Sequence, residues 1–160
     1  MKFLQAPWRW SFISGLLNRD EGCVFCLAQK KDPSEALICH EGKNFFVILN
    51  KYPYNTGHLM VVPKQHFSSP GQVSAADSAE MWELMNRSLE LLKRSFRPDG
   101  FNVGMNLGNA AGAGVKGHFH LHIVPRWSGD SNFMATIGKT KVMSYDLEMV
   151  YKKISEGFKR

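Results

Sequence analysis

The sequence contains few cysteines and no long apolar run. Three cysteines in 160 residues are too few for a scaffold held together by several disulfides, which excludes the class of small cystine-rich secreted domains. No stretch approaches the ~20 apolar residues that a membrane-spanning helix requires. Pro7 and Arg9 interrupt the apolar N-terminal segment before it reaches the length of a signal-peptide core, roughly 7–15 residues. We therefore expect a cytoplasmic protein with no membrane partner.

Positive charge is in excess but is not concentrated. Twenty Lys and Arg against 14 Asp and Glu give a net charge of +6, which favours anionic partners, phosphate-bearing small molecules among them. Adjacent basic residues occur as pairs, such as Lys30-Lys31 and Lys93-Arg94, and no basic stripe is interleaved with aromatic residues. We therefore do not expect a nucleic acid to be the main partner.

The apolar pattern predicts an α+β fold. Stretches 44–50, 58–63 and 101–107 are rich in strand formers. From about Ser74 to Phe96, apolar residues recur every three or four positions, as they do in an amphipathic helix. A segment over about 144–158 has the same spacing. We expect a mainly antiparallel sheet with one long amphipathic helix and a C-terminal helix.

Two connecting stretches are expected to lie in loops. KKDPSE at 30–35 has the composition of a surface loop. The glycine-rich GNAAGAG at 108–114 separates two predicted strands. Because glycine lets the backbone approach a ligand closely, its N–H groups are candidates for contacting an anion.

Half of the six histidines stand at every second position of one apolar run, GHFHLHIVPRW at 117–127. If 118–125 is a strand, His118, His120 and His122 point to one face. At a rise of ~3.3 Å per residue, the outer two are about 13 Å apart, whereas a zinc–nitrogen bond is about 2 Å. One ion therefore cannot bind all three. The run predicts either two histidines on one ion, or a metal at one end and chemistry further along; a solvated polar face is the alternative.

The histidine run and its neighbours resemble a known family. HFHLHIV resembles the signature of the histidine triad superfamily of nucleotide hydrolases and transferases, in which three histidines alternate with apolar residues. Asn50, KYPYNTG and HLMVVP precede it in the family's order. FNVGMNLGNAAGAG and PRWSGDSNF are similar to the bacterial branch that includes diadenosine polyphosphate phosphorylases and hydrolases.

This resemblance implies the domain organisation and the assembly. It covers the chain from about Cys23 to Phe133. It implies a single histidine triad domain over 1–160, with an N-terminal extension at 1–20, a triad core at about 23–133 and the C-terminal helix at about 144–158. It also implies a homodimer.

The resemblance implies three catalytic histidines. His120 would attack the α-phosphate of a nucleotide and form a nucleotidyl-imidazole intermediate, which water or inorganic phosphate then resolves. A neutral imidazole is a competent nucleophile near pH 7, and in the family a backbone carbonyl binds its other nitrogen. His122 would contact phosphate oxygens or assist the leaving group, and His58 would face the same pocket.

The resemblance also implies nucleotide-binding residues. Asn50 corresponds to a ribose-contacting asparagine and Asn106 to a polar residue near the scissile phosphate, although each side chain could instead bond its own backbone. Many relatives have Ser or Thr where this chain has Gly114. Phosphate contact would then fall to the backbone N–H groups of Gly114 and Val115.

Cys23 and Cys26 form a Cys-x-x-Cys pair whose spacing is common in zinc sites, and a tetrahedral site needs two more ligands. The resemblance implies that His66 and His118 complete a structural zinc site; His40 is the rival ligand. A redox pair or two inert thiols are the alternatives for the cysteines.

Several functions stay open on the sequence alone. The expected reaction is cleavage of a phosphoanhydride in a dinucleoside polyphosphate resembling diadenosine tetraphosphate. Hydrolysis of a nucleoside phosphoramidate or adenylated amine would use the same nucleophile. A nucleotide-binding module without turnover, and a catalytic zinc hydrolase using His118 and His120 as joint ligands, are the other candidates.

Overall fold

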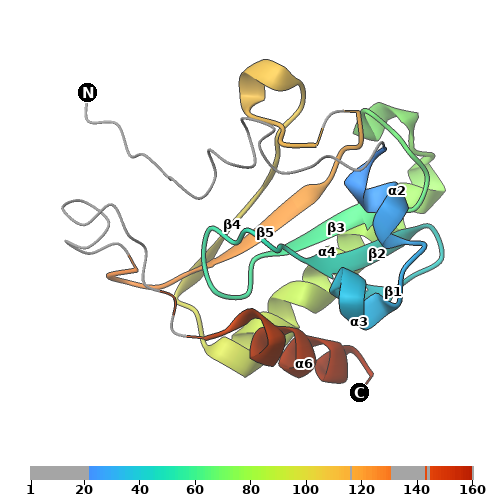
Figure 1. Ribbon diagram of the computed structural model, residues 1–160. Helices are drawn as coiled ribbons and strands as arrows, with labels where there is room; N and C mark the ends of the chain where they lie inside the picture. Colours follow the sequence, from blue (N-terminus) through green and yellow to red (C-terminus); the bar gives the residue numbers. More distant parts are fainter. Residues whose placement is uncertain (1–21, 116, 131–142, 144, 160) are drawn as a thin grey trace.

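An antiparallel sheet forms the centre of the molecule (Figure 1). The computed structural model describes residues 22–115, 117–130, 143 and 145–159. Within them, five strands form one sheet in the order β1-β2-β3-β5-β4, and every neighbouring pair is antiparallel. The strands are β1 (Ile38–Glu41), β2 (Phe45–Leu49), β3 (Leu59–Pro63), β4 (Gly100–Met105) and β5 (Leu121–Arg126). The predicted extension at 1–20 and the end of the predicted core at 131–133 lie outside the described residues.

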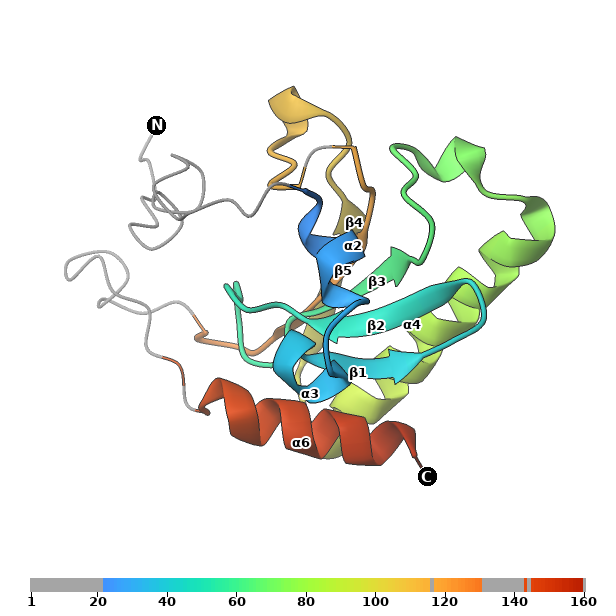
Figure 2. The ribbon, with the colours of Figure 1, turned by 45° about the vertical axis from the view of Figure 1, so that its right-hand side comes forward.

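Helices cover the sheet on both faces. Figure 2 shows α2 in front of the sheet and α4 behind it, with α6 alongside β1. The helices are α2 (Val24–Ala28), α3 (Pro33–Ala36), α4 (Ala75–Phe96) and α6 (Leu147–Phe158), and η1 (Pro70–Gln72) and η2 (Asn109–Ala111) are short 3-10 turns. This arrangement confirms the predicted α+β class. None of the helices in the described part of the chain combines the length and the apolar character needed to cross a bilayer.

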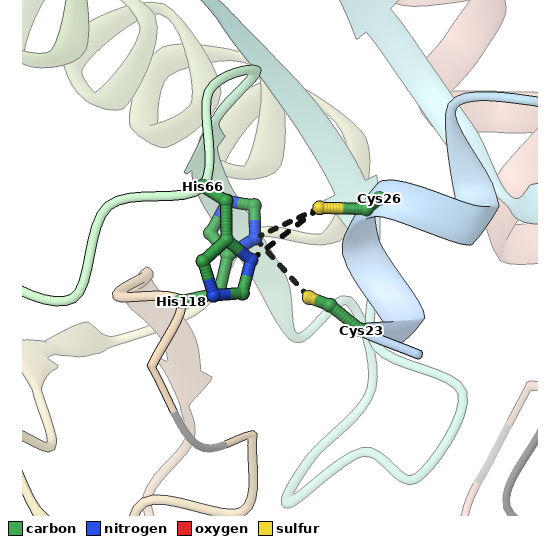
Figure 3. A group of neighbouring side chains, drawn as sticks. All are labelled: Cys23, Cys26, His66 and His118. Carbon is green, nitrogen blue, oxygen red and sulfur yellow. Dashed lines mark hydrogen bonds between the residues drawn. The ribbon is translucent and has the colours of Figure 1, made fainter. Parts of the chain in front are cut away.

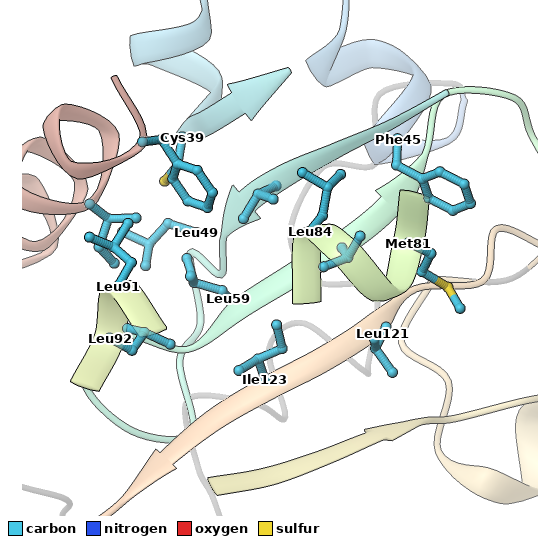
Figure 4. Packing of buried hydrophobic residues seen from close by; sticks show 14 of the residues in the cluster. Cys39, Phe45, Leu49, Leu59, Met81, Leu84, Leu91, Leu92, Leu121 and Ile123 are labelled. Atoms are coloured by element: carbon cyan, nitrogen blue, oxygen red, sulfur yellow. The ribbon is translucent and has the colours of Figure 1, made fainter. Parts of the chain in front are cut away.

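The two faces bury alternate residues of the same strands. Val47, Val61 and Ile123 pack with α4 and α6 in the larger core (Figure 4). Phe46 and Met60 pack with α2 in a smaller cluster on the other face. Because both faces are covered, β2 and β3 are apolar throughout and do not alternate with polar residues. Burying one such side chain fully contributes about 1.5–3 kcal/mol.

The long helix α4 begins and ends where its sequence indicates. Ser74 accepts a hydrogen bond from the N–H of Asp77 and caps the N-terminus. Arg97 ends the helix in the left-handed conformation, at φ 50°, directly before a proline. Gly157 of α6 lies so close to Leu91 that any side chain there would collide with it, so glycine permits the contact between α6 and α4.

Two details differ from the sequence prediction. The stretch predicted as a surface loop at 30–35 contains α3, because Asp32 caps a helical turn that starts with Pro33. The histidine strand begins at Leu121 and not at 118. Leu121 is the first residue of this run paired to either neighbouring strand, and Phe119 instead donates its N–H to the carbonyl of Phe67 at 2.8 Å.

Candidate functional site

The ring of His120 is buried and has one defined tautomer. Its Nδ1 lies 3.0 Å from the carbonyl oxygen of His118, and the residue is 5% exposed. A carbonyl only accepts, so Nδ1 carries the proton and Nε2 keeps its lone pair. Burial lowers the pKa of His120, and the hydrogen bond to the carbonyl opposes this only in part. The imidazole is therefore neutral near pH 7 and nucleophilic at Nε2.

His58 and His122 form a hydrogen-bonded pair beside His120. The N–H of Tyr54 donates to Nδ1 of His58 at 3.1 Å, so the proton of His58 resides on Nε2. That Nε2 lies 2.9 Å from Nδ1 of His122 and donates to it. His122 therefore carries its own proton on Nε2. Its ring centroid is 4.6 Å from that of His120, so the N–H of His122 and the unprotonated nitrogen of His120 belong to adjacent rings.

The space beside His122 is open on one side of the sheet. His122 pairs with Met60 on β3 and with Gly104 on β4. A side chain at Gly104 would meet nothing within 4 Å. Because cross-strand partners project from the same face, the glycine leaves room next to the histidine that a larger residue would occupy.

Four side chains from three parts of the chain converge at the other end of the histidine run (Figure 3). Cys23 precedes α2, Cys26 lies within it, His66 follows β3, and His118 precedes β5. Their ligand atoms all lie within 4.8 Å of one another. Nδ1 of His118 is 3.2 Å from the sulfur of Cys23, and Nδ1 of His66 is 3.4 Å from that of Cys26.

The donor set fits a metal ion. Two thiols and two imidazoles are the ligands of tetrahedral zinc, with bond lengths of about 2.0–2.3 Å. Nε2 of His118 donates to the carbonyl of Pro63 at 2.8 Å, which leaves Nδ1 facing the thiols. A backbone acceptor on the far nitrogen is the usual support of a metal-binding histidine. Burial, followed by the neighbouring Cys23 thiol, raises the pKa of Cys26, and a divalent cation would reverse this effect.

His40, the rival ligand, lies elsewhere. It belongs to β1, where its ring stacks on Phe158 with centroids 4.8 Å apart. Its Nε2 is 3.5 Å from the guanidinium of Arg87. The geometry therefore brings His66, and not His40, to the two cysteines.

The residues expected to bind nucleotide lie in different places and do not line one pocket together. Asn50 accepts a hydrogen bond from the N–H of Tyr52 at 2.9 Å, and its Nδ2 is 3.3 Å from Nδ1 of His58, so its side chain is part of the turn before β3. Asn106 and Val115 line a small hollow, whereas Gly114 is exposed and is not among the lining residues. The lining consists of Ser68, Asn106, Gly108, Ala113, Val115, Gly117, His118 and Phe119. It therefore reaches His118 but not the other two histidines of the run.

The family resemblance implied a backbone carbonyl for His120, but sequence reasoning did not identify the particular groups that set the histidine tautomers. They are the N–H of Tyr54 and the carbonyls of Pro63 and His118. Every residue has such backbone groups, so no residue type marks them. The spacing of four residues between Tyr54 and His58 within a Pro- and Gly-containing turn was the available signal.

An antiparallel sheet with a neutral, oriented imidazole in an alternating trio of histidines defines the histidine triad class of proteins. Comparisons with known proteins agree with this. The family model described as the HIT domain matches residues 31–129, and the chain belongs to the HIT family, a family of nucleotide hydrolases and transferases. This confirms the resemblance on which the predicted site residues depend.

Individual relatives extend the comparison. The chain is 45% identical to a protein of Mycobacterium tuberculosis named AP-4-A phosphorylase, over 88% of this chain and 75% of that protein. It is 31% identical to an uncharacterized HIT-like protein of Methanocaldococcus jannaschii, over 82% and 98% of the two chains. Among solved structures, a zinc-bound histidine triad family protein from Mycobacterium smegmatis superposes with a TM-score of 0.68 at 28% identity, covering 86% of this chain and 94% of that one.

Proposed function

We propose that the protein cleaves a phosphoanhydride bond of a dinucleoside polyphosphate through a covalent intermediate on His120. The observation that carries this proposal is the bond from Nδ1 of His120 to the carbonyl of His118, which leaves Nε2 as an unprotonated nucleophile. The 45% identity to a protein named AP-4-A phosphorylase supports the substrate class and favours inorganic phosphate as the acceptor.

In the first step, Nε2 of His120 attacks the α-phosphorus. The phosphorus–nitrogen bond forms as the bond to the bridging oxygen breaks, and the nucleoside polyphosphate leaves. The N–H at Nε2 of His122 donates a hydrogen bond to the departing oxygen, which leaves as an anion. A hydrogen-bond donor adjacent to the nucleophile supports this role, because charge develops on that oxygen in the transition state.

In the second step, a phosphate oxygen attacks the same phosphorus. The phosphorus–nitrogen bond breaks, its electron pair returns to Nε2 of His120, and any proton of the attacking phosphate is released to solvent. With diadenosine tetraphosphate the first step releases ATP and the second releases ADP. Backbone N–H groups of Gly114 and Val115 are proposed to contact the phosphates, with Asn106 nearby and Asn50 at the ribose.

We also propose that Cys23, Cys26, His66 and His118 bind zinc. Bound there, zinc supplies a closed structural link and no reaction chemistry. The donor set and the spacing of the ligand atoms support the proposal, as does the likeness to a zinc-bound family member. His118 then has two tasks, because its ring faces the thiols while its carbonyl accepts from His120. A homodimer is a separate proposal, tested by the mass of the protein in solution.

The test is product analysis. Purified protein is incubated with diadenosine tetraphosphate, with and without inorganic phosphate, and the nucleotides are separated by chromatography. Phosphate-dependent formation of ADP and ATP is the expected result. AMP plus ATP would show water to be the acceptor, and no turnover of this substrate would overturn the proposal. An adenosine phosphoramidate, assayed in parallel, tests the alternative substrate class.

A further inference from the structure

Two sequence segments that the proposed reaction does not use meet at the end of β5. They are the turn KYPYNTG at 51–57 and the stretch PRWSGD at 125–130. Asn55, which is 6% exposed, connects them. Its Nδ2 donates to the carbonyl of Pro125 at 3.0 Å and to Oδ2 of Asp130 at 2.8 Å. Both hydrogens of this buried nitrogen are therefore used, and the bonds fix the turn against β5.

Asp130 is held in turn by Arg126. The guanidinium donates to both carboxylate oxygens, from Nε at 2.6 Å and from Nη2 at 3.0 Å. Its Nη1 donates to Oδ1 of Asn102 on β4 at 2.6 Å. The Asp130 side chain is 9% exposed, so its position is enclosed as well as bonded. A bidentate pair allows one geometry, which makes Asp130 a fixed point for Asn55.

The turn that Asn55 fixes also sets the ring of His58. The N–H of Tyr54 donates to Nδ1 of His58 at 3.1 Å. The N–H of His58 donates to the carbonyl of Asn55, also at 3.1 Å. Asn55 therefore follows the amide that makes the shorter contact with Nδ1 of His58, 3.1 Å against 3.3 Å from Nδ2 of Asn50, and it directly bonds the backbone of the histidine itself. A shift of Asn55 would move that amide away from the ring.

We propose that Asn55 is a positioning residue for the reaction. Anchored to Pro125 and to Asp130, it holds the Tyr54 amide on Nδ1 of His58 and thereby keeps the proton of His58 on Nε2. His122 then receives that proton's hydrogen bond on Nδ1 and presents its own proton on Nε2. The catalytic consequence rests on the proposed function, whereas the tautomer of His58 is a property of the protein alone.

The first test reads the tautomer directly. Long-range ¹H–¹⁵N correlation spectra of protein labelled at histidine nitrogens, recorded well above the ordinary histidine pKa of about 6.5, show which nitrogen carries the proton. In the unaltered protein His58 is expected as the Nε2–H form alone. In Asn55→Ala, the two tautomers are expected to appear together. A folded Asn55→Ala protein that keeps the single Nε2–H form would overturn the proposal.

Two further variants complete this test. Asp99→Asn is the matched control. Asp99 accepts a hydrogen bond from the N–H of Ser128 at 2.6 Å and so also holds the stretch 125–130, but at a different residue from Asp130, which Asn55 bonds. This variant should leave the His58 signals unchanged. If Asn55→Ala does not fold, Asp130→Asn replaces it, since this variant keeps the shape of the side chain and loses the charge that Asn55 and Arg126 bind. It should also show two tautomers, and a single unchanged form would overturn the proposal.

The second test separates positioning from general loss of structure. Asn55→Ala should lower kcat roughly 10- to 100-fold with little change in KM, which is no more than the roughly 100- to 1,000-fold cost of losing the hydrogen bond to the departing oxygen outright. In a His58→Gln background the same replacement should have no further effect on kcat. Equal fold-losses in both backgrounds would show an independent structural role and overturn the proposal. If no dinucleoside polyphosphate is turned over, the proposed function fails, but the tautomer spectra still decide the role of Asn55.

Discussion

His118 and His120 are two residues apart, and each bonds a backbone carbonyl through one ring nitrogen, but through different nitrogens. His118 uses Nε2, at 2.8 Å from the Pro63 oxygen, and turns Nδ1 toward the thiols. His120 uses Nδ1, at 3.0 Å from the His118 oxygen, and leaves Nε2 unprotonated. Because a carbonyl accepts only, each contact selects one tautomer. The backbone partner, and not the alternation of the run, therefore decides which ring nitrogen of each histidine is left without a proton.

The two ends of the run depend on each other unequally. The ring of His118 belongs to the cysteine group, and its carbonyl belongs to His120. Disorder at the cysteine end should therefore displace the carbonyl of His118 and, with it, change the orientation of the His120 ring. Removal of the His120 ring takes away no contact between His118 and the thiols. Variants at the nucleophilic end should accordingly affect activity alone, whereas variants at the cysteine end should affect metal content, stability and, more weakly, activity.

The largest effect is expected for His120→Ala. Without the nucleophile, kcat should fall about 10,000-fold or more, because covalent catalysis is lost as a whole. Zinc content, measured by atomic emission, should stay at the level of the unaltered protein. Steady-state assays with diadenosine tetraphosphate check the first expectation. Activity within about tenfold of the unaltered protein would show that another residue attacks phosphorus.

His122→Ala should produce the next largest effect. The loss of the hydrogen-bond donor to the departing oxygen should lower kcat with diadenosine tetraphosphate roughly 100- to 1,000-fold. With the p-nitrophenyl ester of AMP, whose departing oxygen spreads its negative charge over the aromatic ring, the loss should be much smaller. Comparing the two substrates isolates the donor role. An equal loss with both would assign His122 to phosphate binding instead.

Cys23→Ala should affect the cysteine end of the histidine run. Binding of zinc at a free concentration 1,000-fold above Kd stabilises a protein by about 4 kcal/mol, which corresponds to a Tm difference of about 10 °C for a chain of this size. The variant should lose zinc and that stability but keep part of its activity.

Cys39→Ala is the matched control for Cys23→Ala. Cys39 is buried in the larger core, and burial raises the pKa of its thiol to about 12. Its replacement should leave the zinc content unchanged. If zinc is retained without Cys23 and activity follows the zinc, a catalytic ion held by His118 and His120 would explain the site better.

Some parts of the fold and of the candidate site could be predicted from the sequence, because they depend on the types of side chain in a run and not on backbone groups. The long helix and the central strands follow from periodicity and from apolar runs such as FFVIL at 45–49, because burial on both faces leaves a continuous signal. β1, with ICHE, is short and mixed in character, and it was not predicted. The alternation of the histidines could be read directly from the sequence.

The choice between His66 and His40 could not be settled from the residues themselves. It depends on how the chain folds back after β3, so that His66 reaches the cysteines of α2 while His40 packs on Phe158. The tautomers could not be predicted either, since they depend on backbone N–H and carbonyl groups that every residue has. The family resemblance, in contrast, implied the ligand set and the need for a carbonyl.

The smallest effect is expected at His40, which lies outside both ends of the run. Burial, followed by the nearby Arg87, lowers the pKa of His40. The unfolded chain therefore binds a proton at this residue below about pH 6.5 that the folded protein does not yet bind, and stability falls as the pH decreases through that value. His40→Gln should reduce the drop in Tm between pH 7.5 and pH 5.5, values chosen about one unit either side of 6.5, by a few degrees at most. It should leave the zinc content unchanged, and a loss of zinc would make His40 the fourth ligand.

The most direct measurement is mass spectrometry of the protein quenched in base, in which a phosphorus–nitrogen bond survives, shortly after mixing with diadenosine tetraphosphate in the absence of inorganic phosphate. We expect an adenylyl group on the peptide that contains His120, which disappears when phosphate is added and is absent from His120→Ala. Turnover of the substrate with the adduct on a different residue would contradict the assignment of Nε2 of His120 as the nucleophile. Formation of the adduct by the His120→Ala protein would contradict it as well.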